Sequence, residues 1–141
     1  MRILLADSRT SVRSALQALL RHRTRARAIG EASNAEELLS KARRLRPDLV
    51  VLDWDLPGLV ADLVPRLRRL CPGLYVIALG VRQEARLSAL LAGADAFVSK
   101  TEPPEHLLSA LWQVEREGGE RERLSALTLQ IPQGCDDNSP S

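Results

Sequence analysis

Three charged residues stand at the ends of short apolar runs in this sequence. Asp7 and Asp53 come directly after such a run, and Lys100 follows the run 96–98 with Ser99 between them. Runs of this kind are typical of strands that are buried on both faces of a parallel sheet. Because open α/β sheets bind ligands at the carboxyl ends of their strands, side chains at these points are placed for chemistry. A carboxylate can attack a phosphoryl group while a metal ion and an ammonium neutralise the charge, so the sequence predicts a small pocket for a cation and a phosphate.

The same three residues also allow a purely structural interpretation. An ion pair of Lys100 with Asp7 or Asp53 would hold three loops together, and the residues alone leave both interpretations open. The choice of lysine is informative, because the chain has 18 arginines and only two lysines. A lysine at a strand end suggests that a compact ammonium is needed there, with chance as the alternative.

Strand-like and helix-like segments alternate five times along the chain. The expected strands, each with the helix that follows it, are 2–6 and 9–21, 26–31 and 35–45, 49–52 and 63–71, 74–79 and 83–92, and 96–98 and 104–117. Leucines at three- and four-residue spacing mark the buried faces of the helices. Since short connections between such units require right-handed crossovers, we expect an α/β fold: a five-stranded parallel sheet with helices on both faces.

Length and composition restrict the kind of protein. At 141 residues the chain fits one domain, and a net charge of +2 is too small to imply a nucleic-acid partner. No apolar run approaches the ~20 residues of a membrane span, and no signal-peptide pattern is present, so we expect no membrane partner and a cytoplasmic location. Gly118 and Gly119 are expected to end the last helix, which leaves residues 1–117 as the domain and 118–141 as a polar, flexible tail.

Several of these segments resemble one known family. The matching stretches are residues 3–7 (ILLAD), 30–34 (GEASN), 47–53 (PDLVVLD), 56–58 (LPG) and 92–100 (AGADAFVSK). Together with the five strand–helix units in order, they resemble the response-regulator receiver domain of two-component signalling, over residues 1–117. The resemblance implies a (βα)5 flavodoxin-like receiver fold. The segment at Gly30 is most similar to receivers that carry a helix-turn-helix output domain.

The resemblance also implies roles for the charged residues. Asp53 would be the phospho-acceptor, and Lys100 would contact the phosphoryl group. Asp7 and Asp53 would bind Mg²⁺, with the backbone carbonyl of Asp55 as a further ligand. Such a protein is not an enzyme in the ordinary sense, but at most an acceptor that phosphorylates itself.

One departure from the family pattern lies beside Asp7. The family normally has a second acid there, and this chain has Ser8. A hydroxyl can coordinate Mg²⁺ directly or through a water, but it brings no charge. A unit charge pair ~4 Å apart at an effective dielectric near 20 is worth roughly 4 kcal/mol before desolvation, so we expect weak Mg²⁺ binding and not its abolition. The alternative is that Ser8 serves only as a helix cap.

Further departures concern the switch positions of the family. Gly80 aligns with the Thr or Ser that grips the phosphoryl oxygen, and the loop after it is about two residues short. Phe97 aligns with the switch aromatic, with core packing as its alternative role. The Asp55 side chain lies where the family tunes the lifetime of the phosphate, and its effect there stays open.

The leading functional hypothesis is a single-domain response regulator. A histidine kinase or phosphotransfer protein would phosphorylate Asp53, and the chain would signal to a downstream protein target through protein–protein contacts, without a DNA-binding domain. The resemblance also allows a homodimer through the fourth and fifth helices. The alternative is a phosphorylation-independent pseudo-receiver that acts as an adaptor or dimerisation module, which Ser8 and Gly80 favour. An enzyme or nucleotide-binding protein has no support, because no glycine-rich loop follows the first strand.

Overall fold

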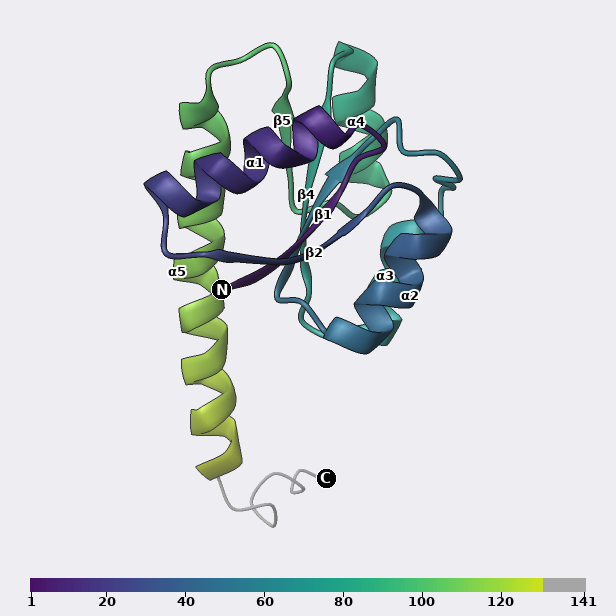
Figure 1. The fold of residues 1–141 in the computed structure, drawn as a ribbon. Coiled ribbons are helices and arrows are strands. Elements are labelled where there is room, and N and C mark those ends of the chain that lie inside the picture. The colour runs from purple at the N-terminus through teal and green to yellow at the C-terminus, as the bar shows by residue number, and fades with distance from the viewer. Residues whose placement is uncertain (131–141) are drawn as a thin grey trace. The chain divides into compact units, whose positions relative to one another are not determined.

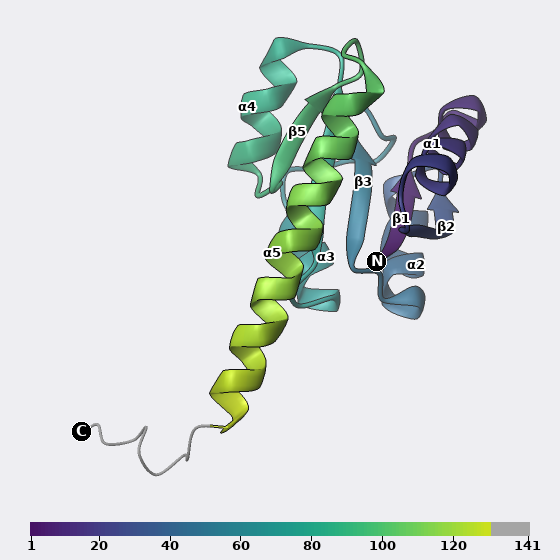
Figure 2. The same ribbon diagram turned by 90° about the vertical axis from the view of Figure 1, so that its left-hand side faces the viewer.

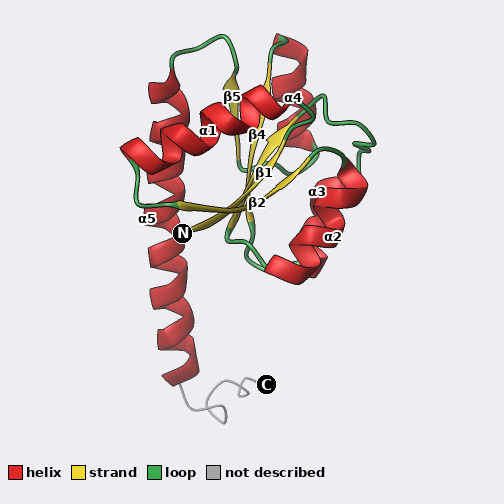
Figure 3. Ribbon diagram, viewed as in Figure 1, coloured by secondary structure: helices red, strands yellow, loops and turns green. Residues whose placement is uncertain are grey.

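Strands and helices alternate along the whole of the described chain. The computed structural model describes residues 1–130, with side chains up to residue 118. Its elements are β1 (Arg2–Ala6), α1 (Thr10–Arg23), β2 (Arg27–Ala32), α2 (Ala35–Leu45), β3 (Leu49–Asp53), α3 (Leu63–Leu70), β4 (Tyr75–Gly80), α4 (Gln83–Leu91), β5 (Ala96–Ser99) and α5 (Pro104–Gln130). Figure 3 shows this alternation by colour.

The strands form one parallel sheet, as the sequence predicts. Their order is β2-β1-β3-β4-β5, and each neighbouring pair is parallel. Figure 1 shows α1 on one side of the sheet and α2 with α3 on the other, while Figure 2 shows β3 and β5 running in one direction. The predicted fold class is therefore confirmed. Since all strands run the same way, the loops after β1, β3 and β5 meet at one edge.

Alternate residues of the central strands are buried on opposite faces, because side-chain direction changes at each strand residue. On one face, Leu4, Val50 and Val76 pack in a cluster with Leu38 of α2 and Leu67 of α3. Their strand neighbours on the other face are also buried, and they include Ile3, Leu5, Leu49, Val51 and Ile77. A sheet covered on both faces explains why its strands read as unbroken apolar runs.

The starts of α1 and α2 are capped differently. The side chain of Asn34 accepts a hydrogen bond from the Glu37 N–H at 2.8 Å and caps α2. The start of α1 differs, because its N-cap is Arg9 and neither Ser8 nor Thr10 caps it. Ser8 is exposed in the loop before α1.

The end of the last helix was predicted wrongly. The helix α5 continues through Gly118 and Gly119 to Gln130. Each glycine costs about 1 kcal/mol in a helix interior, but the residues around this pair are mostly strong helix formers. The expected flexibility of the tail beyond residue 130 lies outside the described residues.

Residues 1–110 form one compact unit, and the rest of α5 belongs to a second. The sheet, helices α1 to α4 and the three charged strand ends all lie in the first unit. None of the helices in the described part of the chain is long and apolar enough to cross a membrane.

Candidate functional site

Asp53 is the last residue of β3 and is buried. Only 3% of it is exposed to solvent. Its backbone is held in register with Leu79 of β4, and the next residue continues the ladder through a hydrogen bond from the Trp54 N–H to the Leu79 carbonyl at 2.8 Å. One carboxylate oxygen, Oδ1, accepts a hydrogen bond from the Asp55 N–H at 3.1 Å. The fold thus presents a desolvated, oriented carboxylate at the edge of the sheet.

Asp7 lies beside it, one residue past β1, and is 1% exposed. Its N–H donates to the Ala32 carbonyl at 3.0 Å, which extends the pairing of β1 with β2. Burial raises the pKa of the Asp7 carboxyl, but hydrogen bonds from the Arg9 N–H and from Lys100, together with the charge of Lys100, outweigh it. The net result is a pKa below the ordinary value.

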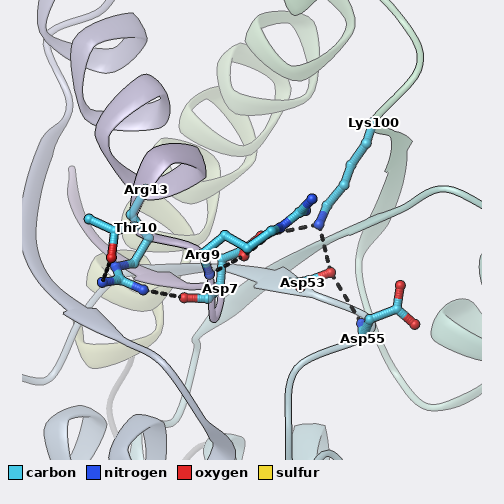
Figure 4. Close-up of polar contacts among 7 residues, drawn as sticks. All are labelled: Asp7, Arg9, Thr10, Arg13, Asp53, Asp55 and Lys100. Carbon is cyan, nitrogen blue, oxygen red and sulfur yellow. Dashed lines mark hydrogen bonds and ion pairs between the residues drawn. The ribbon is translucent and has the colours of Figure 1, made fainter.

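Lys100 joins the two acids. Its Nζ lies 2.8 Å from Asp53 Oδ1 and 3.1 Å from Asp7 Oδ2. Its own N–H donates to the Gly80 carbonyl at 2.8 Å, so that β4 positions the start of the side chain. Figure 4 shows the long lysine side chain reaching across the edge of the sheet to both carboxylates. The structure therefore brings together the three charged residues that the sequence analysis singled out.

The two other residues expected near the metal lie at the rim of this site. Ser8 and Asp55 are both exposed. The backbone of Asp55 is close, because its N–H binds Asp53, but Figure 4 shows its carboxylate turned away from Asp53. In the part of the chain that the structure describes, no three His, Cys, Asp or Glu side chains are gathered to hold a metal ion. The oxygen donors suit a hard cation such as Mg²⁺, but only two of them are buried carboxylates.

The switch positions lie on the β4–β5 side of the site, in contact with each other. A Cβ atom added at Gly80 would lie 2.9 Å from Cε1 and Cζ of Phe97 and 3.2 Å from Cβ of Ala85. Phe97 is buried, and the guanidinium carbon of Arg86 in α4 lies 5.6 Å from the centre of its ring. The aromatic ring thus occupies the space that a Thr or Ser side chain would need at position 80.

Trp54 connects the site to α4. Its indole Nε1 donates a hydrogen bond to Oγ of Ser88 at 3.2 Å, and its side chain packs partly buried against the core. A tryptophan directly after Asp53 is therefore placed to report changes in the site and in the position of α4.

Two arginines of the site were missed by the sequence analysis. Arg9 donates from its backbone N–H to Asp7 Oδ1 at 2.9 Å, and its Nε lies 3.4 Å from the same oxygen. Arg13 donates from Nη1 to the Asp7 carbonyl at 2.6 Å and pairs with Glu31 at 2.5 Å. For Arg9 a signal existed, because aspartates commonly accept a hydrogen bond from the N–H two residues on. For Arg13 the partner on β2 is distant in sequence, and no local signal pointed to it.

Comparison with known proteins agrees with this arrangement. The family model "Response regulator receiver domain" matches residues 3–112. The chain is 34% identical over 129 residues to the nitrate/nitrite response regulator protein NarL of Escherichia coli K12, covering 89% of this chain and 59% of NarL. A CheY-like response regulator receiver domain protein from Methanospirillum hungatei JF-1 has a similar structure, with a TM-score of 0.74, 26% identity, and coverage of 85% and 97% of the two chains.

These findings overturn the expected partners. The sequence analysis assigned a kinase or phosphotransfer protein, a protein target and a homodimer, and excluded a DNA-binding domain. Yet the chain covers only 59% of NarL, and it is 35% identical over 117 residues to the transcriptional activator protein ExaE of Pseudomonas putida, covering 81% of this chain and 55% of that protein. The physical reason for the error is that the sequence of a receiver specifies its own site but not the domains or proteins through which a receiver acts.

The recognition made from the sequence motifs is confirmed. The matched region, residues 3–112, contains the sheet apart from Arg2, and it contains all three charged strand ends. The chain belongs to the response regulator receiver domain family of two-component signalling.

Proposed function

We propose that this receiver accepts a phosphoryl group on Asp53. One observation carries the proposal: two buried carboxylates and one ammonium, from three separate strands, meet with Lys100 Nζ within 3.1 Å of both acids. A simple structural ion pair needs one acid and one cation, and this site buries two carboxylates that share one ammonium. Transfer of a phosphoryl group to Asp53 requires these groups: a nucleophile, a second oxygen ligand for a cation, and a positive charge for the phosphoryl oxygens.

The chemistry follows from the contacts of Asp53. A carboxylate oxygen attacks the phosphorus of the donor, an acyl phosphate O–P bond forms, and the bond between phosphorus and the leaving group breaks, with its electron pair going to the leaving group. The Asp55 N–H on Oδ1 orients the carboxylate for this attack. Lys100 lies where its ammonium would neutralise the phosphoryl oxygens.

Receiver domains typically bind Mg²⁺ at the phosphorylation site, and the donors present here fit a weak site. Asp7 and Asp53 would hold the ion, with the Asp55 carbonyl and the Ser8 hydroxyl or a water as further ligands. When bound, the ion supplies positive charge to the phosphoryl oxygens. Both acids already contact Lys100, and among the described residues no three His, Cys, Asp or Glu side chains gather around a metal position, which is the physical reason to expect weak binding.

Intact-mass measurement after incubation with acetyl phosphate and Mg²⁺ tests the proposal. The wild type is expected to gain one phosphoryl group, and Asp53→Asn is expected to gain none. Asp62→Asn is the matched control, since Asp62 is exposed before α3 and makes no side-chain cap, and it should react like the wild type. Equal modification of all three proteins would refute Asp53 as the acceptor.

A second function is favoured by the packing at Gly80. Because Phe97 fills the space of the missing hydroxyl side chain, the receiver would lack the usual pull on the loop after β4. This is the phosphorylation-independent pseudo-receiver. A wild type that stays unmodified by acetyl phosphate at saturating Mg²⁺, with beryllium fluoride also without effect on Trp54 fluorescence, would decide for it.

The extent of the receiver is part of the proposal. We propose residues 1–117 as the domain and 118–141 as a segment outside it, which the family match over residues 3–112 supports. A cytoplasmic location belongs to the same proposal. At most the chain would act as an acceptor that phosphorylates itself.

A further inference from the structure

Arg9 is a second cation at the acid site. Its side chain is 56% exposed, while the Asp7 side chain that it contacts is 2% exposed. Asp7 Oδ1 receives the N–H of Arg9 at 2.9 Å and has Nε at 3.4 Å. Oδ2 of the same carboxylate contacts Lys100. Both oxygens of Asp7 are thus engaged by positively charged residues.

The position of Arg9 at the start of α1 is explained by its contact with Asp7 and not by the helix. It is the N-cap residue of α1, and the first turn of that helix holds no acidic residue. A cation at a helix N-terminus is disfavoured by the macrodipole, so the helix itself gives Arg9 no reason to stay there. Figure 4 shows the Arg9 side chain extending past Asp7 in the direction of Lys100.

The charge balance of the site follows from two neighbouring residues. Ser8 brings no negative charge, and Arg9 adds a positive one, so both residues make the net charge of the site more positive. Asp7 and Asp53 supply two negative charges, and Lys100 and Arg9 supply two positive ones. The four side chains are balanced without a metal ion.

We propose that Arg9 is a built-in competitor of Mg²⁺ for Asp7, which sets the metal affinity of this receiver. The inference deepens the proposed function, on which it rests for the location of the metal. A divalent cation near Asp7 is repelled by the guanidinium and has to displace it from Oδ1. Removal of the Arg9 charge should therefore tighten Mg²⁺ binding, roughly tenfold as an order of magnitude for one opposing charge at a partly exposed site.

The experiment is a titration of Mg²⁺ into the unphosphorylated protein, followed by Trp54 fluorescence and, independently, by the rise of the thermal unfolding midpoint with Mg²⁺ concentration. Arg9→Ala and Arg9→Gln are compared with the wild type, since the glutamine keeps a polar side chain without the charge. Arg21→Ala is the matched control, because Arg21 is an exposed arginine in the last turn of the same helix.

Both Arg9 variants are expected to bind Mg²⁺ about tenfold more tightly, and Arg21→Ala to match the wild type. Unchanged or weaker binding in both Arg9 variants would overturn the inference, as would an equal gain in Arg21→Ala. The result is separable from the proposed function, because Mg²⁺ binding is measured without a phosphodonor. A wild type that accepts no phosphoryl group, with a gain on removing Arg9, refutes only the acceptor role; normal phosphorylation without that gain refutes only the role of Arg9.

Discussion

The two sides of the site differ in how many of the residues typical of a receiver they contain. On the β1–β3 side, Asp7 and Asp53 are buried and share the ammonium of Lys100. On the β4 side, Gly80 has no side chain, and the ring of Phe97 occupies the space that one would fill. The first region is held by charge, and the second is held by close packing.

The difference indicates which side of the site can adopt a second arrangement of its side chains. An ion-paired site can exchange partners, because the oxygens of a bound phosphoryl group carry negative charge, as the carboxylates do, and can take their place beside Lys100. A packed site cannot, since an aromatic ring against a glycine leaves no free volume for a second arrangement. We therefore expect the chemistry of a receiver at Asp53 to be better preserved than the switching movement after β4.

The largest effect is expected from removing the shared cation. Lys100→Met leaves two buried carboxylates facing each other, and breaking a buried pair costs about 3–5 kcal/mol. Urea denaturation at neutral pH should show a loss in unfolding free energy of about that size. The only other lysine supplies the control: Lys41 is more exposed, its Nζ lies 3.4 Å from Glu37 and also donates to the Glu31 carbonyl, and Lys41→Met should cost about 1 kcal/mol. Similar losses in the two variants would contradict the importance of the buried charges.

The next effect tests the packed side. Gly80→Ala places a Cβ 2.9 Å from the Phe97 ring and should destabilise the protein by about 1–2 kcal/mol through overpacking. Gly30→Ala is the matched control, because its Cβ would meet Leu45 at the same 2.9 Å. There the nearest atoms are the methyl ends of Leu45 and, at 3.2 Å, of Leu4, which turn aside more easily than a ring, so a loss below about 1 kcal/mol is expected.

A double variant sharpens this prediction. Phe97→Leu removes the outer ring atoms that Gly80→Ala would strike. The two changes together should cost less than the sum of their separate effects in the same denaturation experiment. Strict additivity would mean that the ring and the glycine do not depend on each other.

A smaller effect is expected where the two regions are joined. Ser88→Ala removes the hydroxyl that accepts the Trp54 indole N–H at 3.2 Å. The site is partly open to water, so the unfolding free energy should fall by about 0.5–1 kcal/mol. Trp54 emission should change at the same time, because its hydrogen bond is lost. An unchanged emission spectrum would place the indole elsewhere in solution.

The smallest effect appears only in acid. The pKa of Asp7 in the folded protein is below its ordinary value of 3.8, so the unfolded chain takes up the proton first as the pH falls. The stability that Asp7 contributes is complete above about pH 5 and is lost as the pH falls through the folded pKa. The difference in unfolding free energy between wild type and Asp7→Asn should be constant from pH 7 to about pH 5 and shift below it against Asp7. If the difference between the two proteins changed only above pH 5, the pKa of Asp7 in the folded protein would be raised and not lowered, which would contradict this prediction.

Most of the fold could be predicted from the sequence, because its signals are local. The predicted strand 49–52 differs from β3 by a single residue, and α2 was predicted at its observed bounds. The error at the end of α5 is instructive. Two adjacent glycines usually stop a helix, but the preference of the charged residues on both sides outweighed them. Propensities sum over a window, and one pair of residues does not decide them.

The site was predictable as far as strand ends reveal it. Asp7, Asp53 and Lys100 can be identified in the sequence as charged residues at the ends of predicted strands. The contact of the Arg9 side chain and the reach of Arg13 to Asp7 depend on how α1 leaves the sheet, and the sequence spacing predicts only the hydrogen bond from the Arg9 backbone N–H. The contact between Phe97 and Gly80 depends on two neighbouring strands and was equally hidden.

By itself the sequence determined the parallel sheet, the edge at which its charged residues gather, and the family. The first two follow from apolar runs and from charges at their ends, which any parallel α/β sheet brings to one edge, and the family follows from the resemblance of the sequence motifs. The tertiary structure alone decided the balance of charge at Asp7 and the filled space beside Gly80. Both depend on distances of about 3 Å between side chains far apart in sequence or on separate elements, and only the packed chain sets such distances.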